Sequence, residues 1–234
     1  MNDFSSTAGI KLHCSGDFEV LAAAVRTKLS GSDSSHDLDH TLRVMHNVEL
    51  LLAHTPGADA DVVRLSALLH DIARPEEDSA RGCCCHAELG AQQSAVLLKK
   101  YNFPDEIISQ VVHAVRCHRF RKGSPPETVE GQLLYDADKL DSLGAVGLGR
   151  AFLFAGHCNA RLHNSASEAL AGNAYSKEDT AYREYLVKLR HLPDKMFTPY
   201  GKKLAVERLK FMENFFSALE SEINGRTQTY QNLL

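Results

Sequence analysis

The sequence predicts an all-α protein, built as a helical bundle with a C-terminal helical extension. Along most of the 234 residues, apolar side chains recur three and four positions apart, which is the spacing of one helix face. The alternating pattern typical of strands is scarce. Hydrophobic residues make up 44% of the chain, enough for the core of one large domain. We therefore expect a single helical domain.

The first half of the chain shows helical segments separated by clear stop signals. Pro56 ends one segment, and Asp59 can cap the next, which stops before Pro75. Pro104 suits the first turn of a further helix. We expect helices over residues 18–29, 38–54, 59–72, 86–101 and 104–118.

The second half is less regular. A helix is expected over residues 128–143, and Gly144, Gly147 and Gly149 then mark a tightly packed turn or helix junction. Residues 157–180 are polar and rich in Ala, Ser, Asn and Gly, which predicts a mobile segment. Two last helices are expected over 181–192 and 200–222.

These patterns divide the chain into five segments. We expect a flexible N-terminus (1–17), a helical core (18–155), a mobile loop or lid (156–180), C-terminal helices packed on the same domain (181–225) and a tail (226–234). The apolar stripe of the last helix, from Leu204 to Leu219, is expected to be core or a dimer contact, which leaves a homodimer open.

Net charge and cysteine content limit the cellular environment and the binding partners that we expect for this protein. The net charge of −4 and a pI near 6.3 argue against bulk binding of nucleic acid or of an acidic membrane. No apolar stretch approaches the roughly 20 residues of a spanning helix, and the first residues lack the pattern of a signal peptide. The six cysteines, Cys83-Cys84-Cys85 among them, form no CxxC pair; we interpret them as structural or incidental thiols, with a redox or metal role as the alternative. A cytoplasmic location is therefore expected.

One dipeptide carries the strongest chemical signal. His70-Asp71 ends the apolar run from Val62 to Leu69, so an imidazole and a carboxylate lie at the edge of the core. Such a pair can bind one divalent cation, and burying it without a partner would cost several kcal/mol. Taking one ligand group from each of three helices adds His40 and Asp138. Two imidazoles and two carboxylates suit Mn, Mg, Fe, Co, Ni or Zn, with coordination positions left open to water.

The order His40, His70-Asp71, Asp138 resembles the defining pattern of the HD superfamily of metal-dependent phosphohydrolases. The chain is most similar to the bacterial HD-domain nucleotide pyrophosphohydrolases. Segments that carry this resemblance lie around His40, around His70, around His86 and, most specifically, over 135–145, and the likeness extends over about residues 20–225. The resemblance implies an HD domain in the core, 18–155, with the metal at its centre. It also implies hydrolysis of a phosphate ester or anhydride, with nucleoside or deoxynucleoside triphosphates cut to monophosphate and pyrophosphate.

Roles for the remaining polar residues follow from this chemistry. Besides Asp71 itself, Asp141 and Glu88 are candidates for orienting a ligand or accepting a proton. The candidate phosphate-binding cations are Arg43, Arg74 and Lys139, with Arg119, Arg121 and Lys122 in a nearby loop. We expect one tightly bound ion, with His86 and His118 contacting phosphate or holding a weaker second ion; His113 lies in the same interval.

Other functions remain as alternatives. One is a phosphatase or phosphodiesterase acting on another small phosphorylated metabolite. A second is a di-iron oxygenase, which requires His86 and His118 to be ligands of a second, redox-active iron. A third is a nucleotide-sensing module that keeps the metal but lacks turnover. In each case the expected partner is a small molecule rather than nucleic acid or a membrane.

Overall fold

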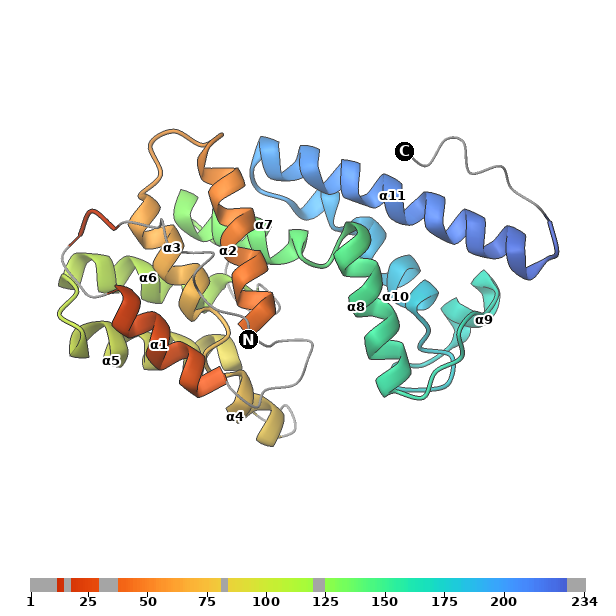
Figure 1. Ribbon diagram of the computed structural model, residues 1–234, viewed down its shortest axis with the longest axis horizontal. Coiled ribbons are helices and arrows are strands. Elements are labelled where there is room, and N and C mark those ends of the chain that lie inside the picture. Colours follow the sequence, from red (N-terminus) through yellow and green to blue (C-terminus); the bar gives the residue numbers. More distant parts are fainter. Residues whose placement is uncertain (1–11, 15–17, 30–37, 81–83, 120–124, 227–234) are drawn as a thin grey trace. The chain divides into compact units, whose positions relative to one another are not determined.

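The structure is a computed structural model, which describes residues 12–14, 18–29, 38–80, 84–119 and 125–226 (Figure 1). Helices joined by loops and turns make up this part of the chain, and no strand occurs in it. The predicted all-α class is therefore confirmed. The chain divides into two compact units, residues 1–138 and 139–234, so the boundary between the units falls inside the segment predicted as the core.

The first unit is built around one buried helix. Its helices are α1 (Phe18–Leu29), α2 (Leu38–Leu52), α3 (Ala60–Leu69), α4 (Arg74–Ser79), α5 (His86–Lys100), α6 (Asp105–Cys117) and most of α7 (Val129–Leu140). Helix α3 contacts α1, α2 and α6, and α5 lies beside α6 (Figure 1). Because α3 is covered on several sides, its apolar residues from Val62 to Leu69 are almost all fully buried.

The residues expected to cap or stop helices lie largely where the sequence predicts them. Asp59 caps α3 by accepting hydrogen bonds from the backbone N–H groups of Asp61 and Val62. One expectation about proline was wrong in detail. Pro104 is the N-cap of α6 rather than a residue of its first turn. Helix α3 ends before Pro75 as expected, and Pro75 lies in the first turn of a short helix, α4, where a proline has no intrahelical hydrogen bond to lose.

In the second unit, a helix starts at the glycines where we expected a tightly packed turn or a helix junction. Its helices are α8 (Gly144–His157), α9 (Ala166–Ala171), α10 (Ala181–Val187) and α11 (Pro199–Ile223). Gly144 adopts φ of +71°, and a Cβ on Gly147 would lie 2.1 Å from the carbonyl oxygen of Ser142. These two glycines start α8 at a close approach, as the tight-packing interpretation predicts. A Cβ on Gly149 would have no atom within 4 Å, so this glycine does not share their role.

Two further segments of this unit differ from expectation. The stretch predicted as a mobile loop or lid contains α9, which starts with a capping box formed by Ser165 and Glu168. The helix expected over 181–192 ends at Val187, where Lys188 departs from helical geometry with φ of −136°. Two 3-10 turns follow, Leu189–His191 and Pro193–Lys195.

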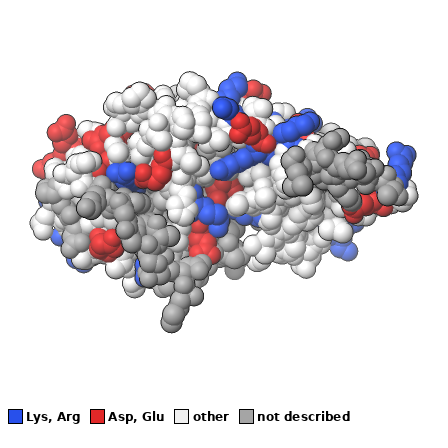
Figure 2. Space-filling view, turned by 45° about the horizontal axis from the view of Figure 1, so that its top comes forward, with Lys and Arg blue, Asp and Glu red and all other residues white. Residues whose placement is uncertain are grey.

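Some predictions concern residues outside the described part of the chain. These are most of the N-terminus 1–17, the tail from residue 227, Cys83, and the loop cations Arg121 and Lys122. Within the described ranges, no helix is long and apolar enough to span a membrane. Figure 2 shows basic and acidic side chains mixed on the face in view, in keeping with the small net charge of −4.

Candidate metal centre

Five helices of the first unit bring together the residues of the candidate site. His40 comes from α2, His70 and Asp71 from the end of α3, and Asp138 from α7. A buried hydrogen bond of 3.0 Å from Asn47 Nδ2 to the carbonyl oxygen of Ala137 ties α2 to α7 beside these ligands. His86 at the start of α5 and His118 at the end of α6 complete the site.

Three side chains form a first ligand group: His40, His70 and Asp138. The Nε2 atoms of His40 and His70 lie 3.1 Å apart, and His40 Nε2 lies 3.5 Å from Asp138 Oδ1. Both imidazoles are fully buried, whereas the Asp138 side chain keeps 16% of its surface exposed. The two imidazoles are therefore shielded from solvent, and solvent contacts this group at the carboxylate of Asp138.

A second ligand group consists of Asp71, His86 and His118. Asp71 Oδ1 lies 3.1 Å from His86 Nε2 and 3.6 Å from His118 Nε2, and these two nitrogens are 3.2 Å apart. The other carboxylate oxygen, Oδ2, lies 3.6 Å from His40 Nε2 and 3.7 Å from His70 Nε2. Asp71 thus faces both ligand groups with one oxygen each.

Burial favours the neutral form of two of these imidazoles, those of His70 and His86. Burial lowers the pKa of His70 to about 4, although Asp71 opposes this shift. Burial also lowers the pKa of His86, again against Asp71. The Nδ1 atoms of His70 and His118 donate to the carbonyl oxygens of Ala67 and Val115, at 2.7 and 2.6 Å. This leaves the lone pair on Nε2, the atom that faces the other ligands.

The distances fit donor atoms that share a metal ion. Nitrogen and oxygen ligands bound at about 2.0–2.2 Å lie roughly 2.8–3.6 Å apart in tetrahedral or octahedral geometry. The separations of 3.1–3.7 Å between Nε2 atoms and carboxylate oxygens fall in or next to this range. The donor set of imidazoles and carboxylates is also one that Zn, Mn, Fe and Co accept. The residues present therefore fit a divalent metal centre, and the set contains no cysteine.

A carboxylate that the sequence analysis did not identify lies behind the second group. Glu77 of α4 accepts hydrogen bonds from His86 Nδ1 at 2.6 Å, Arg74 Nη1 at 2.8 Å and Arg119 Nη1 at 2.6 Å. Arg74 also donates from Nε to Asp71 Oδ1 at 3.3 Å. Two of the predicted phosphate-binding cations thus lie at the site. No sequence spacing identifies Glu77 as a site residue. It lies on α4 and His86 lies at the start of α5, and only the folded arrangement of these two helices brings them together.

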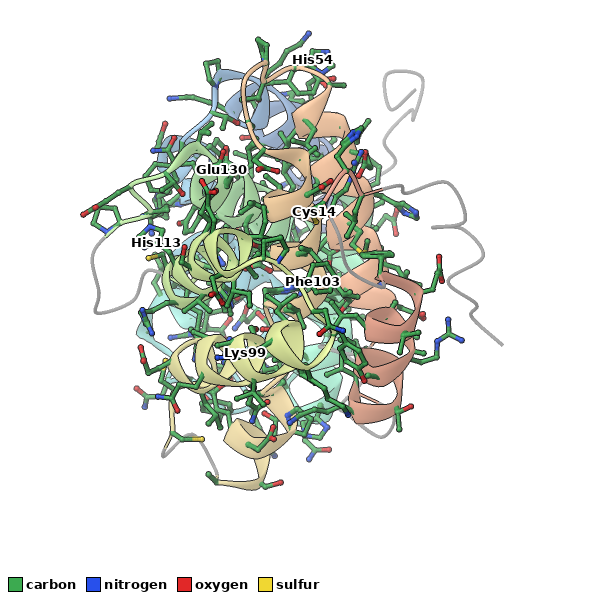
Figure 3. All side chains as sticks on the ribbon, turned by 90° about the vertical axis from the view of Figure 1, so that its left-hand side faces the viewer. Cys14, His54, Lys99, Phe103, His113 and Glu130 are labelled. Carbon is green, nitrogen blue, oxygen red and sulfur yellow. The ribbon has the colours of Figure 1, made fainter. Side chains whose placement is uncertain are left out.

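Other predicted site residues lie elsewhere. Glu88 is half exposed and accepts a hydrogen bond of 3.0 Å from Arg116, so the structure does not bring it to the ligands. His113 lies on the outer side of α6, 3.9 Å from Cys117 Sγ (Figure 3). Arg43 is half-buried on α2, one turn after His40.

Two of the predicted residues belong to the second unit. Lys139 is its first residue and is half-buried. The buried carboxylate of Asp141 accepts a hydrogen bond of 2.7 Å from Arg150 Nη1. This ion pair joins the end of α7 to α8 and gives Asp141 a role in packing its own unit.

Known proteins share both the sequence and the fold. The HD domain family matches residues 37–143. YpgQ of Bacillus subtilis is 31% identical over 212 residues, which cover 88% of this chain and 94% of YpgQ. The crystal structure of YpgQ in complex with ADP has a TM-score of 0.67 at 27% identity, over 87% of this chain and 93% of that chain.

Two further likenesses add to this comparison. A predicted HD superfamily hydrolase from an uncultured Thermotogales bacterium has a TM-score of 0.66 at 26% identity, over 94% of this chain and 99% of that chain. Ribonuclease Y of Thermoanaerobacter pseudethanolicus is 32% identical over 124 residues, which are 53% of this chain and 22% of that protein. The site geometry, the matched HD domain and the near full-length relatives agree: this chain belongs to the HD superfamily of metal-dependent phosphohydrolases.

Proposed function

We propose that the protein hydrolyses a nucleoside or deoxynucleoside triphosphate to the monophosphate and pyrophosphate. The observation that carries this proposal is the pair of buried ligand groups joined by Asp71, with Arg74 and Arg119 beside them. A divalent ion held by these residues would supply a Lewis acid for phosphoryl transfer to water. The α–β anhydride bond breaks, water supplies the new oxygen on the α-phosphorus, and pyrophosphate leaves.

The protein's own residues provide positioning and charge in this reaction. Arg74 and Arg119 carry planar guanidinium groups, which bind phosphate oxygens in a bidentate manner. Their side chains keep 15% and 16% of their surface exposed, so a ligand can contact them from solvent. A crystal structure of the relative YpgQ contains ADP, and this supports a nucleotide as the ligand here as well.

The ligand geometry favours two metal ions over one. We expected His86 and His118 either to contact phosphate or to hold a weaker second ion. Each of the two groups has three donor atoms within 4.8 Å of one another, and Asp71 offers one oxygen to each. Shared carboxylates of this kind are typical of two-metal hydrolytic sites. We therefore infer a second ion, held by Asp71, His86 and His118.

A phosphodiesterase is the second candidate. Ribonuclease Y resembles 53% of this chain, although this region is only 22% of that protein. Cleavage of a phosphodiester needs the same metal centre and the same cations, but a surface that accommodates a nucleotide chain. The small net charge of −4 gives no support for a large polyanionic substrate.

Product analysis separates these functions. The full chain is incubated with nucleoside triphosphates, deoxynucleoside triphosphates, ADP or a short oligoribonucleotide, each with Mn²⁺, Mg²⁺ or Co²⁺, and products are followed by ³¹P NMR. We expect pyrophosphate and a monophosphate from triphosphates. Orthophosphate with a diphosphate would identify a phosphatase, and a shortened oligonucleotide would identify the second candidate; either result alone overturns the proposal.

A further inference from the structure

We propose that Glu77 is a positioning residue that fixes the tautomer of His86 and holds the guanidinium groups of Arg74 and Arg119 where a phosphate can bind them. The proposal rests on the proposed function, because it assigns Glu77 to the same site. It concerns a side chain that binds neither metal nor the reacting atoms. Glu77 acts through three neighbours that come from α4, from α5 and from the residues just after α6.

The hydrogen bond between Glu77 and His86 determines where the imidazole carries its proton. Glu77 forms ion pairs with two guanidinium groups, those of Arg74 at 2.8 Å and Arg119 at 2.6 Å, so it lies in this site as a carboxylate. An ionised carboxylate can only accept hydrogen bonds. Because Glu77 Oε2 lies 2.6 Å from His86 Nδ1, the proton must lie on Nδ1. The Nε2 atom, 3.1 Å from Asp71 Oδ1, is then the one with a free lone pair.

This arrangement distinguishes His86 from His70 and His118. His70 and His118 donate from Nδ1 to carbonyl oxygens three residues earlier in the chain. His86 is the first residue of α5, so no preceding helical turn is available to it. A carboxylate takes the place of the carbonyl oxygen. A carboxylate partner makes an imidazole a stronger ligand than a carbonyl does, because its charge stabilises positive charge on the ring.

The same carboxylate aligns two cations. Arg119 Nη1 donates to Glu77 Oε1 at 2.6 Å, and Arg74 Nη1 donates to Oε2 at 2.8 Å. Arg119 Nη1 also lies 3.1 Å from His86 Nδ1, but a protonated Nδ1 cannot accept from it. Within the described residues, Nη2 of Arg74 and Nε and Nη2 of Arg119 donate no hydrogen bond. These N–H groups can therefore bind an anion while Nη1 stays on Glu77.

The chain offers a matched control on the same helix. Glu76, next to Glu77 on α4, binds Lys28 Nζ at 2.7 Å and Gln93 Nε2 at 3.0 Å, away from the ligand groups. Glu77→Asp and Glu76→Asp both keep the charge and remove one methylene. Any difference between the two variants then reports the position of the carboxylate rather than its charge. Thermal unfolding of both variants shows whether either has lost its fold.

The first test is the tautomer of His86 in the metal-free full chain, read from ¹⁵N chemical shifts of histidine-labelled protein. We expect the Nδ1-protonated form in the wild type and in Glu76→Asp, and a mixture of tautomers in Glu77→Asp. A wild-type His86 protonated on Nε2 would overturn the proposal, and so would a tautomer that Glu77→Asp leaves unchanged. This measurement needs neither metal nor turnover, so it decides the role of Glu77 even if the proposed activity fails.

The second test is calorimetric titration with inorganic pyrophosphate. Misplaced guanidinium groups lose charge-assisted hydrogen bonds, so we expect Glu77→Asp to bind pyrophosphate about tenfold more weakly than the wild type. Glu76→Asp is expected to bind like the wild type. Equal or tighter binding by Glu77→Asp, with its unfolding temperature unchanged, would contradict the alignment of Arg74 and Arg119 by Glu77.

Discussion

At the scale of single residues, Asp71 accounts for the assembly of the site. Its two carboxylate oxygens lie 3.1–3.7 Å from the Nε2 atoms of four imidazoles, two in each ligand group. Only 3% of its surface is exposed, and although Arg74 Nε donates to it at 3.3 Å, burying a carboxylate is costly. A divalent ion on each side would offset this cost further, in keeping with a buried aspartate that follows an apolar helix.

The histidine pair on α6 offers a sharp test of the second ligand group. His118 belongs to that group, whereas His113, on the same helix, lies near Cys117 instead. His118→Gln is expected to retain about one ion fewer per chain and to lose activity by more than about tenfold, and His113→Gln to retain both ions. Metal content after dialysis, measured by mass spectrometry, checks this. Equal metal content in the two variants would show that His118 is no ligand.

The sequence predicted which residues lie together at the site where the order of the motifs along the chain identified them. The sequence predicts that His40, His70, Asp71 and Asp138 meet, and the structure places all four together. Their roles as ligands stay a prediction. Glu88 was a candidate for accepting a proton, but it lies two residues after His86 on α5, and two residues along a helix point to nearly opposite faces. Glu77 could not be found in this way, because nine residues and a change of helix separate it from His86.

At the scale of elements, most helix starts were predicted to within one residue, and the start of α8 was an exception. Three glycines in the first six residues of α8 have low helix propensity, so the sequence indicated a tightly packed turn or a helix junction there. Contacts in the folded chain decide otherwise: Gly147 lies against the carbonyl oxygen of Ser142, and Gly144 lies against Arg208. Long segments with regular apolar spacing, such as α1, α2 and α5, were predicted to within about two residues at each end.

Two of these glycines give a matched pair of variants. A Cβ at Gly147 would lie 2.1 Å from the carbonyl oxygen of Ser142, whereas nothing lies within 4 Å of one at Gly149. Gly147→Ala should lower the free energy of unfolding by about 1–3 kcal/mol. Gly149→Ala should raise it by about 0.5–1 kcal/mol, because alanine favours the helix. Chemical denaturation of both variants measures this; a stable Gly147→Ala variant would mean that α8 does not start as described.

At the scale of the whole molecule, both ligand groups belong to one compact unit. All six side chains lie between residues 40 and 138, in the first unit. They come from helices that are far apart in sequence, so the site exists only when this unit is folded. Metal binding and folding of the first unit are therefore coupled.

This coupling predicts a local effect of metal on stability. An ion at 100 times its Kd stabilises the state that binds it by about 2.7 kcal/mol. On addition of Mn²⁺ to the metal-free chain, amide hydrogen exchange should slow most in α2, α3, α5 and α6, and less in α11. Mass spectrometry of peptides from these helices measures the difference. Slowing that is strongest in α11 would place the metal outside the ligand groups.

The central claim is that a metal centre built around Asp71 hydrolyses phosphate bonds. The most direct measurement is phosphate and pyrophosphate release from a panel of nucleotides by the metal-stripped chain, restored with one divalent ion at a time. Asp71→Asn is compared with Asp78→Asn, a change at an exposed position on α4. We predict release by the wild type and by Asp78→Asn with at least one metal, and none by Asp71→Asn. Release that is independent of metal, or absent from the wild type with every metal, would contradict this account.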